Sequence, residues 1–320
     1  MKVPGCQGAR VPGCLAVFVL FLDAQPIGSI TPQPGITAAA TVARAYDLIL
    51  DADFEGAAKA LPQTCPPAPR VACLGLEALS LWWQIQLEPE SLRLDSAFMT
   101  AVTSAIAEAE RMTDAEPQRA EAWFYLGAAY GVRAQFRVHR VDRLAAARDG
   151  KRIKQSLEHA LALDPEMHDA EFGIGMYRYY ADVAPAVLRM LRWLFLLPGG
   201  DRVDGLRQLE RAATLGVLVR GEAQYQIHVL YLWYEQKWPQ ALALIRGLQV
   251  RYPHNPLFRQ IEAEILDKYF HDPAASLTAS EQLLALAQSR SVFRADLAEQ
   301  AARRNIAKQS LALTPPRKQN

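Results

Sequence analysis

The chain of 320 residues is 51% hydrophobic and 22% charged, which is typical of a globular protein with a sizeable core and excludes a disordered one. Its 35 basic and 34 acidic residues are interspersed and give a net charge of +1, so the basic face that general nucleic-acid binding requires is missing. Alanine and leucine are abundant, whereas β-branched runs are scarce. We therefore expect an all-α protein with no nucleic-acid partner.

Residues 1–24 have the features of a secretory signal peptide. Lys2 and Arg10 precede the apolar run CLAVFVLFL at 14–22, and Ala24 follows closely. The run is too short to span a bilayer, which needs about 20 residues. We predict cleavage after Ala24, a linker over 25–36 and export to the periplasm or the cell exterior. The alternative is a misassigned translation start that adds a disordered tail.

Cys65 and Cys73 are the two cysteines that remain after removal of this predicted signal. They are eight positions apart, and the three prolines between them favour a bent path that brings the two thiols together. In an oxidising compartment this pattern predicts a disulfide, while two idle thiols are the alternative. The spacing suits neither a redox Cys-x-x-Cys pair nor a zinc site.

Two helical pairs are predicted in the first part of the exported chain. The segment 43–61 reads as one pair whose second helix starts at Phe54. The segments 74–87 and 96–117 read as the next pair, because apolar residues recur in both at helical spacing.

The segment 123–130, WFYLGAAY, carries the strongest motif of the chain. Trp123, Leu126, Gly127 and Tyr130 form the Trp-x-x-Leu-Gly-x-x-Tyr signature of the first helix, helix A, of a tetratricopeptide repeat. The chain thus resembles the tetratricopeptide repeat superfamily. The resemblance implies an α-solenoid of antiparallel helix pairs over residues 37–313, with two repeats expanded by insertions.

The first expanded repeat runs from Trp123 to Pro165, a separation well beyond that of a standard repeat. We expect two extra turns in each of its helices, and Pro165 in the first turn of the helix that follows. The tip of this longer hairpin carries four arginines. They are either a solvated tip or a docking patch for an acidic partner: Arg133, Arg137, Arg140 and Arg143.

The second expanded repeat lies between Ile174 and Ala212. We predict that its helix A ends near Asp182, that an inserted helix spans 185–197, and that helix B resumes near Val203 with Asp201 as its N-cap. The middle of this segment also resembles the inclusion-body clearance family, which comprises fungal mitochondrial outer-membrane proteins and their animal relatives. The matching positions are Gly173, Gly175, Tyr177, Pro185, Gly200, Asp201, Gly205 and Leu206.

That family implies helical repeats without catalysis. The present chain is shorter and carries an export signal, so an exported protein of the bacterial envelope fits better than a mitochondrial one. Downstream, Gly221 to Pro253 forms a regular repeat, the segments 255–270 and 276–290 continue the helices, and 291–313 is a closing helix. The tail 314–320 is expected to be frayed.

Enzyme signatures are largely absent: there is no Gly-x-Ser-x-Gly, no phosphate-binding glycine loop and no His-Glu-x-x-His. We therefore expect no catalytic residue, cofactor or metal. In tetratricopeptide arrays helix A lines the concave groove, and its ligand-facing positions here are mostly aromatic. They form either a groove for a peptide or protein partner, or part of the core: Phe124, Phe172, Met176, Tyr179, Tyr180, Leu230, Trp233 and Tyr234.

The leading hypothesis is a non-enzymatic exported scaffold that binds another protein. The alternative is a protein of the membrane surface, docked through the apolar helix 185–197 with Arg189, Arg192 and Trp193 at the lipid headgroups. A hydrolase or transferase built on a helical-repeat frame is a third possibility.

Overall fold

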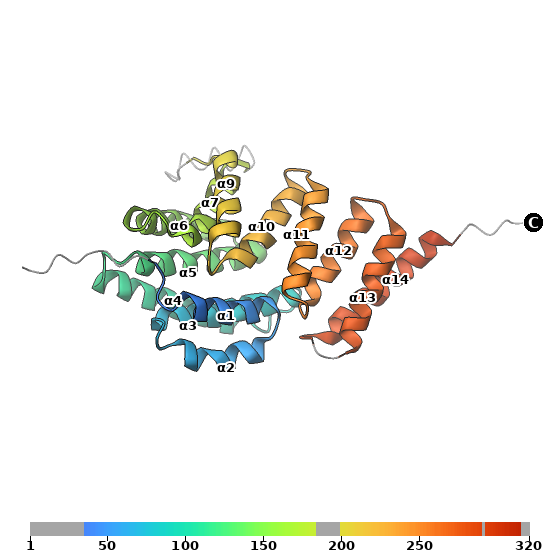
Figure 1. Ribbon diagram of the computed structural model, residues 1–320, viewed down its shortest axis with the longest axis horizontal. Helices are drawn as coiled ribbons and strands as arrows, with labels where there is room; N and C mark the ends of the chain where they lie inside the picture. Colours follow the sequence, from blue (N-terminus) through green and yellow to red (C-terminus); the bar gives the residue numbers. More distant parts are fainter. Residues whose placement is uncertain (1–34, 184–198, 290–291, 315–320) are drawn as a thin grey trace, which may run out of the picture. The chain divides into compact units, whose positions relative to one another are not determined.

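The computed structural model describes residues 35–183, 199–289 and 292–314, all within one compact unit, Pro32–Asn320. In these ranges the chain forms thirteen α-helices and no strand (Figure 1), which confirms the all-α prediction. In chain order the helices are α1 Ala39–Leu50, α2 Phe54–Thr64, α3 Arg70–Leu87, α4 Asp95–Ala115, α5 Ala120–His139, α6 Arg143–Leu163, α7 His168–Val183, α9 Arg202–Leu215, α10 Arg220–Trp233, α11 Trp238–Arg251, α12 Pro256–Lys268, α13 Pro273–Gln288 and α14 Ala295–Leu313.

Consecutive helices pack side by side, most extensively α5 with α6, α7 with α9, and α13 with α14. The odd-numbered helices α1, α3, α5 and α7 also contact one another in turn, so successive pairs stack. Short loops join most helices, which makes neighbours antiparallel. This arrangement is consistent with a helical repeat.

The hairpin of α5 and α6 is longer than the others, as expected. These helices have 20 and 21 residues, whereas α10 and α11 have 14 each. Pro165, however, lies in the turn before α7 and not in its first helical turn. The carboxylate of Asp164 accepts hydrogen bonds from the backbone N–H groups of Glu166 and Gly35, and this fixes a separate turn between the two helices.

Most of the arginines near the hairpin tip bind groups of their own chain. Arg133 and Arg137 both pair with the buried carboxylate of Asp149 on α6. Arg140 pairs with Asp95 at the start of α4 and donates to the carbonyls of Pro89 and Ser91. These side chains therefore tie the hairpin together and to the preceding loop, while Arg143 is exposed.

In the second expanded repeat the start of helix B agrees with the prediction. Helix α7 extends to Val183, the last described residue before 199, and α9 begins at Arg202 after Asp201, whose side chain accepts from the N–H of Asp204 at 2.9 Å. A Cβ added to Gly175 of α7 would lie 2.7 Å from the carbonyl oxygen of Gly205 of α9. Glycine therefore allows the close approach of the two backbones. The predicted inserted helix at 185–197, with Arg189, Arg192 and Trp193, lies outside the described residues.

Cys65 and Cys73 form a disulfide with a Cα–Cα distance of 6.3 Å, as predicted. It joins the end of α2 to the first turns of α3. The closing helix α14 begins at Ala295, later than the predicted start.

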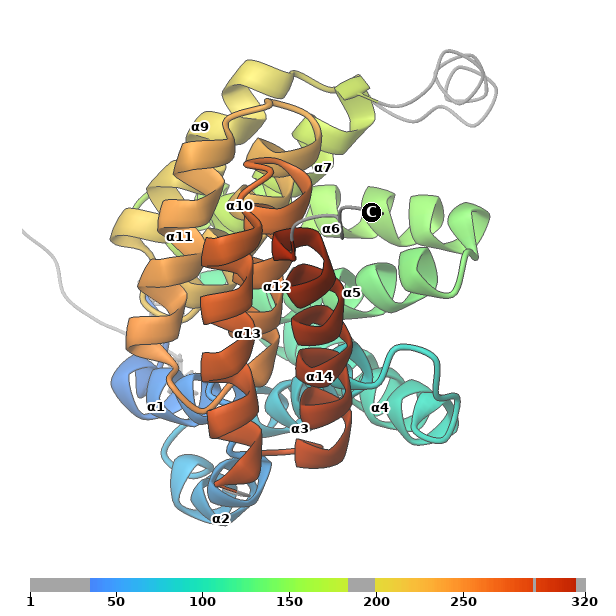
Figure 2. The same ribbon diagram turned by 90° about the vertical axis from the view of Figure 1, so that its right-hand side faces the viewer.

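The first helix is tied to residues some two hundred positions later. Asp47 of α1 accepts from the hydroxyl of Tyr252 at 2.7 Å and pairs with Arg251. The side-chain amide of Asn255 donates to the carbonyl of Leu50 at 2.7 Å. Figures 1 and 2 both place α1 next to the end of α11. These contacts bring the N-terminal helices against the α10–α12 region and enclose the space between them.

Candidate functional site

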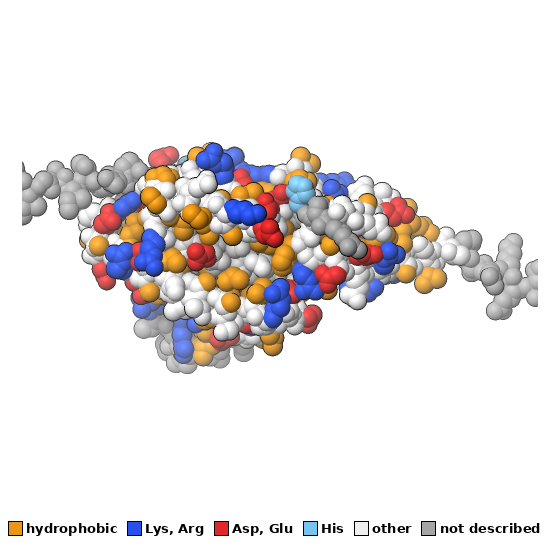
Figure 3. Space-filling view, turned by 90° about the horizontal axis from the view of Figure 1, so that it is seen from below, with side chains coloured by type: hydrophobic (Ala, Val, Ile, Leu, Met, Phe, Trp, Pro, Cys, Tyr) orange, Lys and Arg blue, Asp and Glu red, His pale blue; other side chains and the backbone are white. Residues whose placement is uncertain are grey.

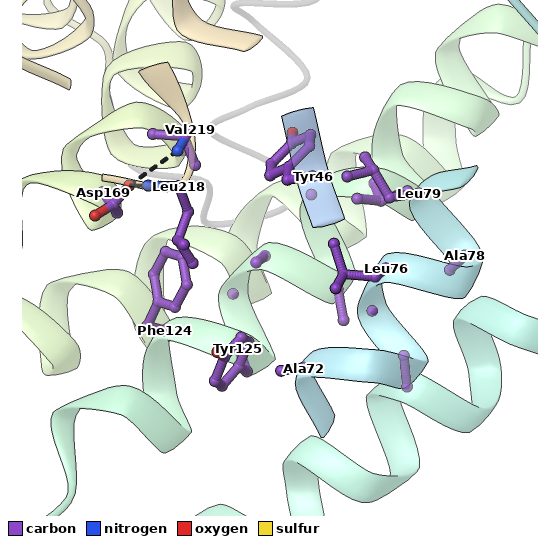
Figure 4. A pocket seen from close by; sticks show the side chains of 18 of the residues that line it. Tyr46, Ala72, Leu76, Ala78, Leu79, Phe124, Tyr125, Asp169, Leu218 and Val219 are labelled. Atoms are coloured by element: carbon purple, nitrogen blue, oxygen red, sulfur yellow. Dashed lines mark hydrogen bonds between the residues drawn. The ribbon is translucent and has the colours of Figure 1, made fainter. Parts of the chain in front are cut away.

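An apolar cavity of about 110 Å³ lies among the inner helices α1, α3, α5, α7 and α10. Phe124 of α5 and Leu218 of the α9–α10 loop lie on one side of it, and Leu76 and Leu79 of α3 lie on the other (Figure 4). The cavity thus lies between the first helices and the start of α10.

Glu222 is a buried carboxylate beside this cavity, at the start of α10. It accepts from the indole N–H of Trp83 at 3.1 Å, from the hydroxyl of Tyr46 at 3.4 Å and from the amide of Gln226 at 3.2 Å. Burial raises the pKa of Glu222, and these three hydrogen bonds partly offset the rise. The carboxylate thus joins α10 to α1 and α3.

Asp169 of α7 is a second buried carboxylate in the cavity wall. It accepts from three consecutive backbone N–H groups, those of Val217, Leu218 and Val219, at 2.7–3.0 Å. The bond to Val219 is drawn in Figure 4. Asp169 therefore holds the α9–α10 loop in place as one side of the cavity.

Burial is also the main cause of the shifted pKa values of Tyr125, in the cavity wall, and of His228 on α10. Burial raises the pKa of the Tyr125 hydroxyl and lowers the pKa of His228 to about 4, so this imidazole is neutral at pH 7. His228 Nδ1 donates to the carbonyl of Tyr225, which fixes the tautomer. Among the described residues, no three His, Cys, Asp or Glu side chains are grouped as metal ligands.

The eight predicted groove residues do not form one surface. Phe124 and Phe172 line the cavity, and Met176 is half-buried. Tyr179 and Leu230 are completely buried, so neither side chain is open to a partner in this conformation. The other three lie at the C-terminal ends of α7 and α10: Tyr180, Trp233 and Tyr234.

These three residues belong to a larger group of rings on α7, at the end of α10, at the start of α11 and directly after α12, which we name the aromatic edge: Tyr180, Trp233, Tyr234, Trp238, Tyr269 and Phe270. Trp233 is 66% exposed and Tyr234 is 39% exposed. The Tyr180 and Tyr234 rings are in edge contact at 5.8 Å, and Trp238 and Tyr269 are 5.6 Å apart. The α10–α11 and α12–α13 loops that carry most of these rings lie together at the top of Figure 1.

A partly exposed ion pair between Arg202 and Glu235 lies next to the aromatic edge. Tyr179 packs its ring against those of Tyr180 and Tyr234, and its hydroxyl donates to Glu235. Glu235 also accepts from the guanidinium of Arg202 at 2.7 and 2.8 Å. Hydrogen bonding to Arg202 lowers the pKa of Glu235, while burial and the bond to Glu235 raise the pKa of Tyr179.

Basic and acidic side chains are interspersed over the face shown in Figure 3. No strongly charged patch on this face therefore indicates a second candidate binding surface. Over the described ranges, no helix has the length and apolar character needed to cross a membrane.

The sequence reasoning missed half of the aromatic edge, namely Trp238, Tyr269 and Phe270. A signal for them exists, because Tyr234 and Tyr269 both directly follow the last residue of a helix, α10 and α12 respectively. An aromatic residue at the same place in two successive repeats indicates one shared surface.

No protein-family model matches the chain, and no curated protein matches it either.

Proposed function

We propose that this protein is a non-enzymatic scaffold that binds a protein partner through the aromatic edge. The observation that carries the proposal is the run of exposed rings across the ends of neighbouring helix pairs. Large exposed apolar side chains gathered on one side of a protein surface are typical of an interaction site. Tryptophan and tyrosine also contribute most to binding at such sites, since each buries a large area with few rotatable bonds.

The rings are held in place before any partner arrives. Tyr234 is fixed by its edge contacts with Tyr179 and Tyr180, and Trp238 packs on Tyr269. Ordered side chains lose less conformational entropy on binding, so more of the interaction energy remains as affinity.

The proposed architecture is a tetratricopeptide-like solenoid, supported by the stacked helix pairs and the Trp123–Tyr130 signature. Export to a bacterial envelope is supported by the signal-like sequence at 1–24, and the Cys65–Cys73 disulfide is compatible with an oxidising compartment.

The test compares three forms of the full chain, tagged and expressed in the native host, after mild cross-linking and affinity purification. The wild type and Val250→Ser should recover the same stoichiometric partner, because Val250 is 85% exposed on α11 and outside the aromatic edge. The double variant Trp233→Ser/Tyr234→Ser should lose it. Equal recovery of the partner by the double variant would refute the proposal.

A further inference from the structure

The inner cavity is a second feature with the properties of a binding site, and it shares no residue with the aromatic edge. Its walls are almost entirely apolar. The two carboxylates next to it, Glu222 and Asp169, already accept three hydrogen bonds each. An occupant of the interior therefore needs apolar surface and no charge.

Two glycines keep the cavity open. Gly75 of α3 and Gly131 of α5 line it, and a Cβ added at either position would meet no atom within 4 Å. Glycine within a helix is unfavourable relative to alanine, and here no close backbone contact requires it. Gly175 is different, since its added Cβ would meet a backbone oxygen at 2.7 Å. Gly75 and Gly131 thus provide empty space, unlike Gly127 and Gly173 in the same wall, whose added Cβ atoms would meet Leu157 at 2.4 Å.

The lining residues extend along much of α5. On α5 they run from Phe124 to Gln135, which corresponds to about 16 Å of helix at 1.5 Å per residue. The volume of about 110 Å³ is smaller than the ~150 Å³ of an engineered cavity that holds a benzene ring. A small volume distributed over this length fits an unbranched chain better than a ring.

One end of the lined stretch is polar. Gln135 is half-buried there, and its side-chain oxygen accepts from the amide of Gln226 at 3.1 Å. The N–H groups of the Gln135 amide are able to donate to an oxygen atom of a ligand.

We infer that the cavity binds the straight hydrocarbon chain of a small amphiphile, whose oxygen-bearing head group lies at Gln135. This binding is separate from partner binding at the aromatic edge, because the two sites share no residue, so either one can be absent without the other.

The test measures binding of straight-chain primary alcohols with 6, 8, 10 and 12 carbons to the full-length protein by titration calorimetry. Each added methylene should strengthen binding about fourfold until the cavity is full, after which affinity should level off. Gly131→Leu, which places a side chain in the cavity, should weaken binding at least tenfold.

The matched control is Gly247→Leu, because Gly247 is also a helical glycine with open space around it but lies on the exposed surface of α11. It should bind within twofold of the wild type. Urea unfolding shows whether Gly131→Leu is folded, and if it is not, the milder Gly75→Ala/Gly131→Ala variant replaces it with the same expected direction. No binding to the wild type, or equal binding by the cavity variants, would overturn the inference.

Discussion

The inner cavity and the aromatic edge are both lined by large apolar side chains, yet they are formed in different ways. The cavity exists because α1 packs against residues some two hundred positions later, through Glu222, Tyr252 and Asn255. The aromatic edge arises locally, from rings near the ends of neighbouring helix pairs, among them Tyr234 and Tyr269, which directly follow α10 and α12. The cavity therefore depends on contacts between residues far apart in the sequence, whereas the aromatic edge depends on the local sequence of each repeat.

The largest loss of stability is expected beside the cavity, on removal of the Glu222 carboxylate. Glu222→Ala leaves the indole N–H of Trp83 and the hydroxyl of Tyr46 buried without the acceptor that they use. We expect the free energy of unfolding in urea to fall by about 4 kcal/mol.

The isosteric Glu222→Gln keeps an acceptor oxygen and should lose less than half of that amount. A loss below 1 kcal/mol for Glu222→Ala would mean that Glu222 does not hold α10 to α1 and α3.

The inner helices should also respond to pH through His228. Its folded-state pKa of about 4 lies below the unfolded value near 6.5, so between these values the unfolded state binds more protons. Stability is then fully present above pH 6.5 and decreases as the pH falls towards 4. Between pH 7 and pH 5 we expect a loss of about 2 kcal/mol.

His228→Asn should reduce this slope in urea titrations at the two pH values. An unchanged slope in the variant would assign the pH dependence to other groups.

Glycine substitutions should show that the cavity has spare space. Gly131→Ala should raise the free energy of unfolding by about 0.5–1 kcal/mol, because alanine favours the helix and its methyl group meets nothing within 4 Å. Gly175→Ala, at the α7–α9 contact, should instead destabilise the protein. Destabilisation by Gly131→Ala would show that the position is packed in solution.

The smallest effect on stability is expected at the aromatic edge. Trp233→Ser should change the free energy of unfolding by no more than about 0.5 kcal/mol, because its side chain is mostly exposed. A larger loss, measured by urea unfolding, would indicate that Trp233 supports the fold and is not reserved for a partner.

The sequence predicted what depends on local pattern. Helix α2 begins at Phe54 and Asp201 caps α9, as expected, because capping and amphipathic spacing are encoded over a few residues. The contact between α1 and the end of α11 was not predictable, since it pairs residues such as Asp47 and Tyr252 that no repeat spacing connects.

Contacts between distant residues also explain why the eight predicted groove residues do not form one surface. Helical spacing placed Tyr179 and Trp233 on comparable faces, but burial depends on which neighbour covers each face. Tyr179 is covered by Tyr234 and bound to Glu235, whereas Trp233 is the last residue of α10 and its side chain is mostly exposed.

The central claim, that the aromatic edge binds a partner protein, is tested most directly by site-specific photocross-linking in the native host. A benzophenone amino acid replaces Trp233 in one form of the protein and the exposed Val250 in another. We predict one discrete cross-linked protein from position 233, identified by mass spectrometry and absent from position 250. The same product from both positions, or none from position 233, would contradict the claim.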